Sequence, residues 1–254
     1  MLADHQLTDH QLTDHVIAAR LAVAAGDLLV ALRSSGPSGA ELGRRGDLAS
    51  HQLIASAIAE LRPGDILLSE EGDDDPRRIG ADRVWIVDPL DGTREYIDGD
   101  RADWAVHVAI VDIEGRPRAA AVALPAEGLV FVTDPPPSVP PILQGTPRIV
   151  VSRTRPAREA TKVATALGAE LVGLGSAGAK AMAVVRGQAE IYVHSGGQYE
   201  WDSCAPVAVA AAAGLHCSRI DGEPLVYNRP DVYLPDLLIC HPALAEEVLR
   251  VLAG

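Results

Sequence analysis

Residues 85–95 of the chain, Trp-Ile-Val-Asp-Pro-Leu-Asp-Gly-Thr-Arg-Glu, place two carboxylates three positions apart at the end of an apolar run. The run from Val84 to Val87 has no polar face, which predicts a strand that is covered on both sides. Pro89 fixes its own φ and favours an extended conformation for Asp88. Gly92 can adopt backbone angles that are closed to other residues. A tight turn is therefore expected to follow the strand.

This turn would bring Asp88, Asp91 and the carbonyl of Leu90 toward one point. Hard oxygen ligands crowded together suit Mg²⁺, Mn²⁺ or Ca²⁺ better than zinc. The alternative is an ordinary turn at the end of a strand, because Asp, Pro and Gly all favour turns. Further motifs are needed to decide between the two.

Three other segments place carboxylates at the ends of predicted elements. Ser-Glu-Glu at 69–71 follows a short apolar stretch, and Glu-Trp-Asp at 200–202 precedes an Ala-rich stretch. Asp47 stands at the start of a helical pattern that runs to Leu61, after a predicted loop over 34–46. Each also has a structural interpretation, since Asp47 and Asp202 could be helix N-caps and the two glutamates a solvated loop.

The order of these motifs resembles one superfamily over nearly the whole chain. Ser-Glu-Glu, Trp-Ile-Val-Asp-Pro-Leu-Asp-Gly-Thr, Gly-Ser-Ala-Gly-Ala-Lys at 175–180 and Trp-Asp before a helix are similar to the lithium-sensitive, magnesium-dependent phosphatases. These include inositol monophosphatase, fructose-1,6-bisphosphatase and the CysQ-type 3′-phosphoadenosine-5′-phosphate (PAP) phosphatases. The stretches 175–182, 196–202 and 233–238 are most similar to short actinobacterial CysQ proteins.

The predicted elements divide the chain at a Pro-rich segment. Residues 1–133 show an α+β pattern with an antiparallel meander over 104–132, residues 134–147 form the connector, and residues 148–254 show alternating strands and helices. The resemblance implies an α+β fold, a layered αβαβα sandwich with the site in the cleft between the two halves. Most metal ligands would then belong to the first half, and one metal ligand with the substrate contacts to the second.

Composition limits the class of protein. The 254 residues are 48% hydrophobic and carry a formal net charge of −13, without the basic stripe of a duplex-binding protein. No apolar run approaches the ~20 residues of a membrane span, and no signal peptide is evident. Three cysteines in apolar stretches suit reduced thiols. We therefore expect a cytoplasmic protein that binds neither nucleic acid nor membranes.

The histidines have mainly structural interpretations. The tandem repeat Asp-His-Gln-Leu-Thr at 4–8 and 9–13 spaces its histidines five apart, so they do not share a helix face, and a frayed extension is expected. His107 lies inside a predicted strand and is expected to be a satisfied core residue.

The resemblance also assigns a metal centre and a mechanism. The implied ligands of two or three Mg²⁺ ions are Glu70, Asp88, the Leu90 carbonyl, Asp91 and Asp202. Asp88 would bridge two ions, while Asp47 and Thr93 would orient and deprotonate an attacking water. Mn²⁺ is expected to substitute, and Ca²⁺ and Li⁺ to inhibit. No covalent nucleophile is required, since the sequence contains neither a Cys-x₅-Arg nor a P-loop motif.

Substrate preference follows from weaker signals. The implied substrate contacts are Gly92, Thr93, Ser152, Arg155, Ser176, Lys180, Glu200 and Asp202. Lys180, the only lysine after Lys162, would hold the 5′-phosphate of PAP unless it is an exposed helix charge. Arg155 stands where CysQ relatives have His, and Glu200 could face a ribose hydroxyl, a third metal or solvent.

The expected activity is removal of the 3′-phosphate of PAP, or of its sulfated form PAPS, in sulfate assimilation. The alternatives are an inositol-1-phosphate or fructose-1,6-bisphosphate phosphatase and, more remotely, a non-catalytic nucleotide or cation binder. A homodimer is expected from the superfamily.

Overall fold

The computed structural model describes residues 12–142 and 145–254, so most of the N-terminal repeat lies outside the described residues. Its α-helices are α1 (Asp14–Ser35), α2 (Ala40–Leu61), α3 (Thr93–Ile97), α4 (Arg158–Leu167), α5 (Ala177–Val185), α6 (Glu200–Ala212) and α7 (Pro242–Ala253). Its strands are β1 (Ile66–Ser69), β2 (Arg83–Asp91), β3 (Ala105–Asp112), β4 (Pro117–Leu124), β5 (Leu129–Val132), β6 (Arg148–Ser152), β7 (Glu170–Leu174), β8 (Ile191–Tyr199), β9 (His216–Ser218) and β10 (Tyr233–Cys240).

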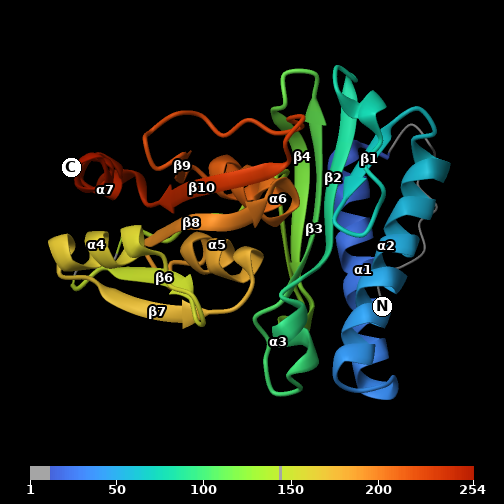
Figure 1. The fold of residues 1–254 in the computed structure, drawn as a ribbon, viewed down its shortest axis with the longest axis horizontal. Helices are drawn as coiled ribbons and strands as arrows, with labels where there is room; N and C mark the ends of the chain where they lie inside the picture. Colours follow the sequence, from blue (N-terminus) through green and yellow to red (C-terminus); the bar gives the residue numbers. More distant parts are fainter. Residues whose placement is uncertain (1–11, 143–144) are drawn as a thin grey trace.

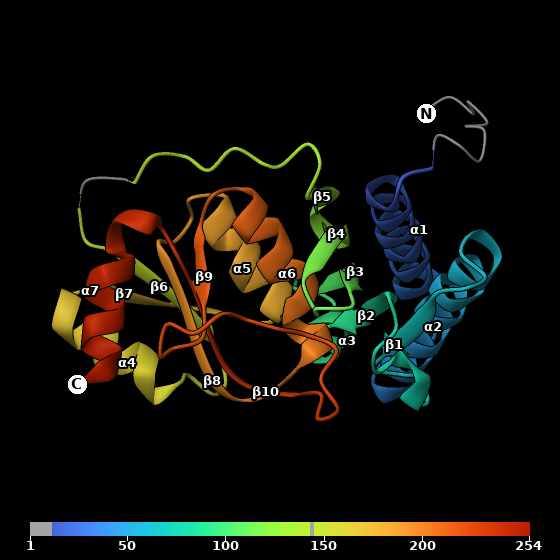
Figure 2. The same cartoon turned by 90° about the horizontal axis from the view of Figure 1, so that it is seen from above.

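These elements form five layers. From above, α1 and α2 cover one face of the first sheet, α5 and α6 lie between the two sheets, and α4 and α7 cover the outer face of the second (Figure 2). The expected αβαβα sandwich is therefore confirmed. Two sheets with helices on every face explain why the strands β2 and β3 are apolar on both sides.

The first sheet has the order β1-β2-β3-β4-β5 (Figure 1). β1 pairs with β2 in parallel, and the remaining pairs are antiparallel, which confirms the meander expected from the sequence. β2 is buried from Val84 to Asp91. Its pairing with β3 is regular up to Asp88 and irregular between Asp88 and Asp91, at the predicted turn.

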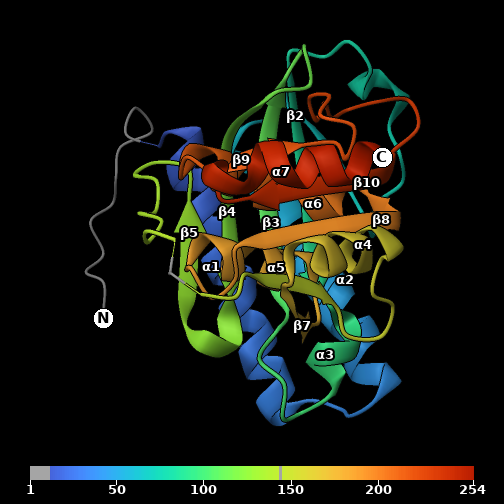
Figure 3. The same ribbon diagram turned by 90° about the vertical axis from the view of Figure 1, so that its left-hand side faces the viewer.

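The second sheet has the order β7-β6-β8-β10-β9. β6 is parallel to β7 and β8, whereas β10 is antiparallel to β8 and β9. Helices α4 and α7 cross its outer face (Figure 3). β8 continues to Tyr199 and leads directly into α6.

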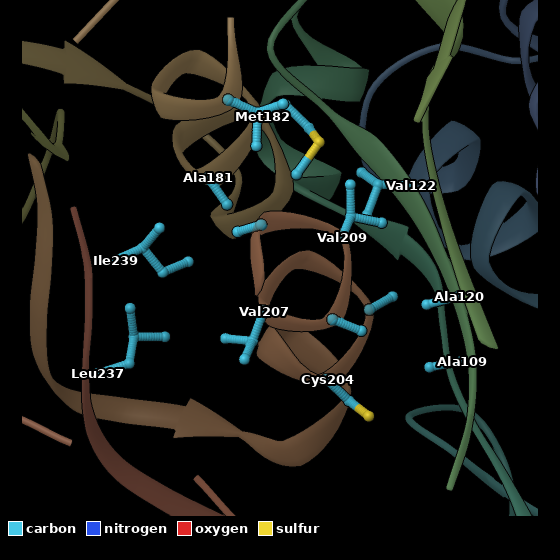
Figure 4. Packing of buried hydrophobic residues seen from close by; sticks show 14 of the residues in the cluster. Ala109, Ala120, Val122, Ala181, Met182, Cys204, Val207, Val209, Leu237 and Ile239 are labelled. Carbon is cyan, nitrogen blue, oxygen red and sulfur yellow. The ribbon is translucent and has the colours of Figure 1, made fainter. Parts of the chain in front are cut away.

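Small side chains let α6 lie between the sheets. Figure 4 shows Val207 of α6 directed toward β10, where Leu237 and Ile239 lie, and Val209 directed toward Val122 of β4. The chain has one Phe and three Trp. The layers are therefore joined by Ala, Val, Leu and Ile contacts, and each buried Leu or Ile contributes about 1.5–3 kcal/mol.

The helix α1 is long and apolar enough to cross a membrane, judged by length and composition alone. One of its faces, including Ile17, Leu21 and Leu29, is instead buried against β3, β4 and α2. This packing is that of a core helix.

The predicted loop over 34–46 is wrong for its second part, because α2 begins at Ala40. Gly43 and Gly46, which disfavour a helix by propensity, lie inside it. A Cβ on Gly43 would lie 2.9 Å from the Thr93 methyl carbon, and one on Gly46 would lie 2.9 Å from the ring of Tyr96. The two glycines therefore let α2 pack closely against α3, and this contact decides the position of Asp47.

Candidate active site

The turn after β2 is built as the sequence indicates. Asp88 and Asp91 are buried, and the Asp88 carboxylate accepts a hydrogen bond of 3.0 Å from the Leu90 amide. Gly92 has φ +87°, in the left-handed region, and is followed at once by α3. A Cβ on Gly92 would lie 2.9 Å from that of Ser176, so the close approach of the two halves also requires glycine here.

Asp202 joins the two aspartates from the other half of the chain. Single carboxylate oxygens of Asp88, Asp91 and Asp202 all lie within 4.8 Å of one another. Asp202 lies in the first turn of α6, and its carboxylate accepts the amide of Tyr199 at 2.7 Å. The N-cap of α6 is Tyr199, so the interpretation of Asp202 as the N-cap is wrong. Asp202 instead completes a capping box from the third helical position and also belongs to the cluster.

The electrostatics of the cluster favour a bound cation. Burial, together with the charges of Asp91, Glu70 and Asp202, raises the pKa of Asp88 well above its usual range. Burial and the charge of Asp91 raise the pKa of Asp202 to about 6. Carboxylates that cannot all ionise in the free protein are an arrangement that divalent ions stabilise.

Glu70 stands beside this group. Much of the residue is exposed, but its carboxylate faces the other anions, and burial and the charges of Asp202, Asp47 and Asp91 raise its pKa to about 7. Its oxygens are not part of the tight trio. The solvated-loop interpretation therefore agrees with the exposed turn at Glu70 and Glu71 but leaves out the anions beside Glu70.

Asp91 differs from the other carboxylates. Burial alone would raise its pKa, but the adjacent His107 ring, the charge of Lys180 and the Gly178 amide hold the pKa of Asp91 below its usual range. The Gly178 amide donates to Oδ2 of Asp91 at 2.7 Å. His107 is fully buried, as expected of a core residue, but it contacts the cluster.

Asp47 and Thr93 lie together at the edge of the cluster. The Thr93 hydroxyl is 3.3 Å from Oδ1 of Asp47 and 3.3 Å from the carbonyl of Leu90. Burial and the charge of Glu71 raise the pKa of Asp47 to about 6. Because Asp47 lies in the middle of α2, the N-cap interpretation is wrong.

Lys180 is buried in α5 and is not an exposed helix charge. Its Nζ donates to the carbonyls of Gly175 and Ser176, and it lies 5.4 Å from the centre of the Tyr192 ring. Burial lowers the pKa of Lys180, while Asp91 and Asp202 oppose this shift. Ser176, whose hydroxyl accepts the Ala179 amide at 2.9 Å, caps the same helix.

Ser152 and Arg155 lie at the end of β6. The Ser152 hydroxyl accepts the Arg155 amide at 3.3 Å, and the Arg155 side chain is exposed. Glu200 is 1% exposed, and its two oxygens accept the amides of Asn228 and Arg229 at 2.6 and 2.8 Å. The solvent-facing alternative for Glu200 is therefore wrong, because its carboxylate anchors the loop before β10.

Sequence reasoning missed two residues that support the site. Arg33 of α1 donates to the carbonyls of Glu95, Asp98 and Arg101 and so holds α3 and the loop after it. Its only signal is a cation at the end of an apolar helix. His194 of β8 has a pKa lowered to about 4 by burial and by the charges of Lys180 and Arg155, which marks a local concentration of positive charge.

The sequence of the chain matches the family model described as "Inositol monophosphatase family" over residues 16–253. The chain belongs to the inositol monophosphatase family. The sequence motifs and the fold thus lead to the same assignment, and members of the family are metal-dependent phosphatases.

Curated relatives span most of the chain. A 3′-phosphoadenosine 5′-phosphate phosphatase of Mycobacterium bovis is 49% identical over 219 residues, covering 84% of this chain and 82% of the relative. One of Mycobacterium leprae is 46% identical over 249 residues, covering 93% and 92%. The 3′(2′),5′-bisphosphate nucleotidase CysQ of Escherichia coli K12 is 33% identical, covering 74% and 80%.

Solved structures confirm the fold. An inositol monophosphatase from Zymomonas mobilis superposes with a TM-score of 0.77 at 22% identity, covering 95% of this chain and 98% of that one. CysQ from Bacteroides thetaiotaomicron gives 0.77 at 24% identity, covering 90% and 97%.

Proposed function

We propose that the protein is a magnesium-dependent phosphatase that removes the 3′-phosphate of PAP to give AMP and phosphate. The observation that carries this proposal is the meeting of Asp88, Asp91 and Asp202 beside the Asp47–Thr93 pair. The names of the mycobacterial and enterobacterial relatives support the choice of substrate. PAPS, the sulfated form of PAP, is the second proposed substrate. Hydrolysis of PAP or PAPS would place the enzyme in sulfate assimilation.

The proposed ligands of two or three Mg²⁺ ions are Glu70, Asp88, the Leu90 carbonyl, Asp91 and Asp202. Crowded carboxylates with raised pKa values fit hard divalent cations, and Mn²⁺ is expected to substitute. When bound, such ions neutralise phosphate charge and acidify a water. Ca²⁺, which prefers more ligands and longer bonds, and Li⁺, with half the charge, are expected to inhibit.

The Asp47–Thr93 pair supplies the base. The carboxylate of Asp47 accepts the hydrogen of the Thr93 hydroxyl, which orients the oxygen of Thr93 to accept a proton from the attacking water. As the Thr93 oxygen takes this proton, its own hydroxyl hydrogen passes to Asp47. The water oxygen bonds to phosphorus as the bond to the 3′-oxygen breaks, and the leaving oxygen takes a proton from a solvent water. Gly92 and Thr93 offer backbone amides to the phosphate at the start of α3.

The second phosphate of PAP requires cations in a chain of net charge −13. We place Arg155 at this phosphate, since its side chain is exposed beside Ser152. Lys180 would act from beneath the site, because its amine already donates to two carbonyls and orders the loop at Gly175 and Ser176.

A phosphate-release panel tests the substrate. The protein, with and without Mg²⁺, is given PAP, PAPS, inositol-1-phosphate and fructose-1,6-bisphosphate. We expect Mg²⁺-dependent release with the highest kcat/KM on PAP. A higher kcat/KM on inositol-1-phosphate or on fructose-1,6-bisphosphate would replace the proposed substrate, and no release from any of them would favour a non-catalytic binder.

We also propose a cytoplasmic homodimer that binds neither nucleic acid nor membranes. The dimer rests on the resemblance to the superfamily alone, and the net charge of −13 does not favour binding to polyanions. The three cysteines, Cys204, Cys217 and Cys240, are free thiols, which suits a reducing compartment. Sedimentation equilibrium of the full chain tests the dimer, since a mass near that of one chain would contradict it.

A further inference from the structure

The His107 side chain in β3 contacts both halves of the acidic cluster. Its Nδ1 is 3.1 Å from the carbonyl of Trp201, the residue directly before Asp202. Its Nε2 lies 3.2 Å from Oδ2 of Asp91, an ion-pair distance without the alignment of a hydrogen bond. A carbonyl and a carboxylate both accept hydrogen bonds, so each ring nitrogen of His107 lies beside an acceptor.

Gly178 of α5 holds the same oxygen of Asp91 from the other side. Its amide donates to Oδ2 at 2.7 Å. A Cβ at this position would lie 2.2 Å from His107 Nε2 and 2.9 Å from the Cβ of Ala105, so α5 reaches this depth because the residue is glycine. Oδ2 of Asp91 is therefore fixed by β3 and α5, and the other carboxylate oxygen is left for a cation.

A histidine that only filled the core would not need these contacts. The neighbours on the same face of β3, Ala105 and Ala109, fill their buried positions with apolar side chains. A buried imidazole costs free energy unless its polar atoms find partners. Both of its nitrogens here are directed at the segments that carry Asp91 and Asp202.

We propose that His107 is a positioning residue that fixes Asp91 relative to Asp202, so that carboxylates from the two halves of the chain form one metal site. This inference rests on the proposed roles of Asp91 and Asp202 as metal ligands. Residues that orient metal ligands in this way typically change metal affinity or activity by about 10–100-fold when replaced.

Three substitutions separate positioning from packing. His107→Leu keeps most of the volume and removes both polar contacts. His107→Gln keeps a donor near the position of Nε2, toward Asp91, whereas His107→Asn keeps one near Nδ1, toward Trp201. Val111→Ala, at a buried position on the same strand, is the matched control for a packing defect.

The experiment titrates Mn²⁺ into each metal-free, full-length protein by calorimetry and measures its Tm separately. We expect His107→Leu to weaken Mn²⁺ binding by about 10–100-fold. His107→Gln should recover more of the affinity than His107→Asn, because it restores the contact with the ligand itself. Val111→Ala should lower the Tm and leave Mn²⁺ affinity unchanged.

Two results would overturn the proposal: a leucine variant with wild-type Mn²⁺ affinity, or a Gln variant no better than the Asn variant. Should the leucine variant not fold, the comparison of Gln with Asn decides alone. The assignment of the metal ligands has its own control, since the Asp88→Asn variant should not bind Mn²⁺ at the proposed site. If the wild-type chain bound no Mn²⁺ in this way, the proposed metal centre would fail first, and the role of His107 with it.

Discussion

The Thr93 hydroxyl lies 3.3 Å from the carboxylate of Asp47, although 46 residues separate the two in sequence. Thr93 begins α3, and Asp47 lies one turn after Gly43 in α2. The missing side chain of Gly43 is what lets the Thr93 methyl group approach α2. The base of the proposed reaction therefore depends on a close contact between two helices.

Thr93→Ala removes the hydroxyl together with the γ-methyl group that contacts α2. We expect kcat on PAP to fall by at least ~100-fold, the usual scale for loss of general-base help. Mn²⁺ affinity, measured calorimetrically, should stay near the wild-type value, because the side chain of Thr93 is not a proposed ligand.

Thr93→Ser is the matched control, since it keeps the hydroxyl and loses the methyl group. It should retain most of kcat. An alanine variant that lost metal binding and turnover to the same extent would assign Thr93 to the architecture of the site and not to water activation.

The metal-free protein should become less stable as the pH rises from about 5 to about 8. The pKa values of Asp47 and Asp202 are raised to about 6 and that of Glu70 to about 7, from 3.8 and 4.5. The folded chain then holds more protons than the unfolded chain in this window, so the free energy of unfolding falls with rising pH. Asp91, whose pKa is lowered, contributes a change only below this window.

Thermal unfolding in the presence of a chelator measures this effect. We expect the Tm to fall by at least about 3 °C over the window, since ~1 kcal/mol corresponds to about 2–4 °C in a protein of this size. Mg²⁺ should raise the Tm more at the higher pH, because ions and protons compete for the same carboxylates. A Tm independent of pH and of Mg²⁺ would contradict the charge balance described for the cluster.

Asp88→Asn should separate stability from activity. Removing a buried charge from the repelling cluster should raise the Tm of the metal-free protein at about pH 8. The same change removes the proposed bridging ligand, so Mg²⁺-dependent kcat should fall by several orders of magnitude. Near-normal turnover by Asp88→Asn would place the metal site elsewhere.

The residues of the acidic cluster were easier to predict from the sequence than the structure that surrounds them. The carboxylates at the ends of β1 and β2 could be recognised because apolar runs lead directly into them, and those after β8 because an Ala-rich stretch follows them. The start of α2 could not, since Gly43 and Gly46 disfavour a helix locally and become useful only against Thr93 and Tyr96. Contacts between distant segments decide such positions, and no local pattern records them.

The same limit applies to single polar residues in apolar surroundings. His107 lies among apolar residues of β3 and Arg33 near the end of the apolar helix α1, where packing is the simplest interpretation. Their partners are known only from the fold: Asp91 and the carbonyl of Trp201 for His107, and three carbonyls of α3 and the loop after it for Arg33. Lys180 was recognised as unusual because lysine is rare in the chain, but its burial was not predicted.

Lithium should inhibit turnover at concentrations in the tens of millimolar, an order of magnitude set by its weak binding to hard oxygen sites. A monovalent ion in a position meant for Mg²⁺ carries half the charge that the carboxylates and phosphate require. Initial rates measured against Li⁺ at several Mg²⁺ concentrations test this, with Na⁺ as the control. Insensitivity to Li⁺ would count against two neighbouring metal positions.

Arg155→Ala and Lys180→Ala should affect the substrates differently. Arg155 is exposed beside Ser152. Its loss should weaken PAP binding by about 1–3 kcal/mol, the range of a charge-assisted hydrogen bond. This loss should appear as a higher KM for PAP with kcat unchanged. Inositol-1-phosphate has no second phosphate, so kcat and KM on this substrate should be the same for Arg155→Ala and for the wild type.

Lys180→Ala removes a buried cation whose charge acts on Asp91 and Asp202 and whose amine orders the carbonyls of Gly175 and Ser176. The Lys180→Ala variant should therefore have a lower kcat on PAP and, to the same extent, on any other substrate that the protein hydrolyses. Its Tm should be lower as well. Lys180→Arg, which keeps the charge but not the volume, serves as the control for charge. If Lys180→Ala raised only the KM for PAP, we would assign the contact with the 5′-phosphate to Lys180 and not to Arg155. Only a direct contact with the substrate confines the loss to substrate binding.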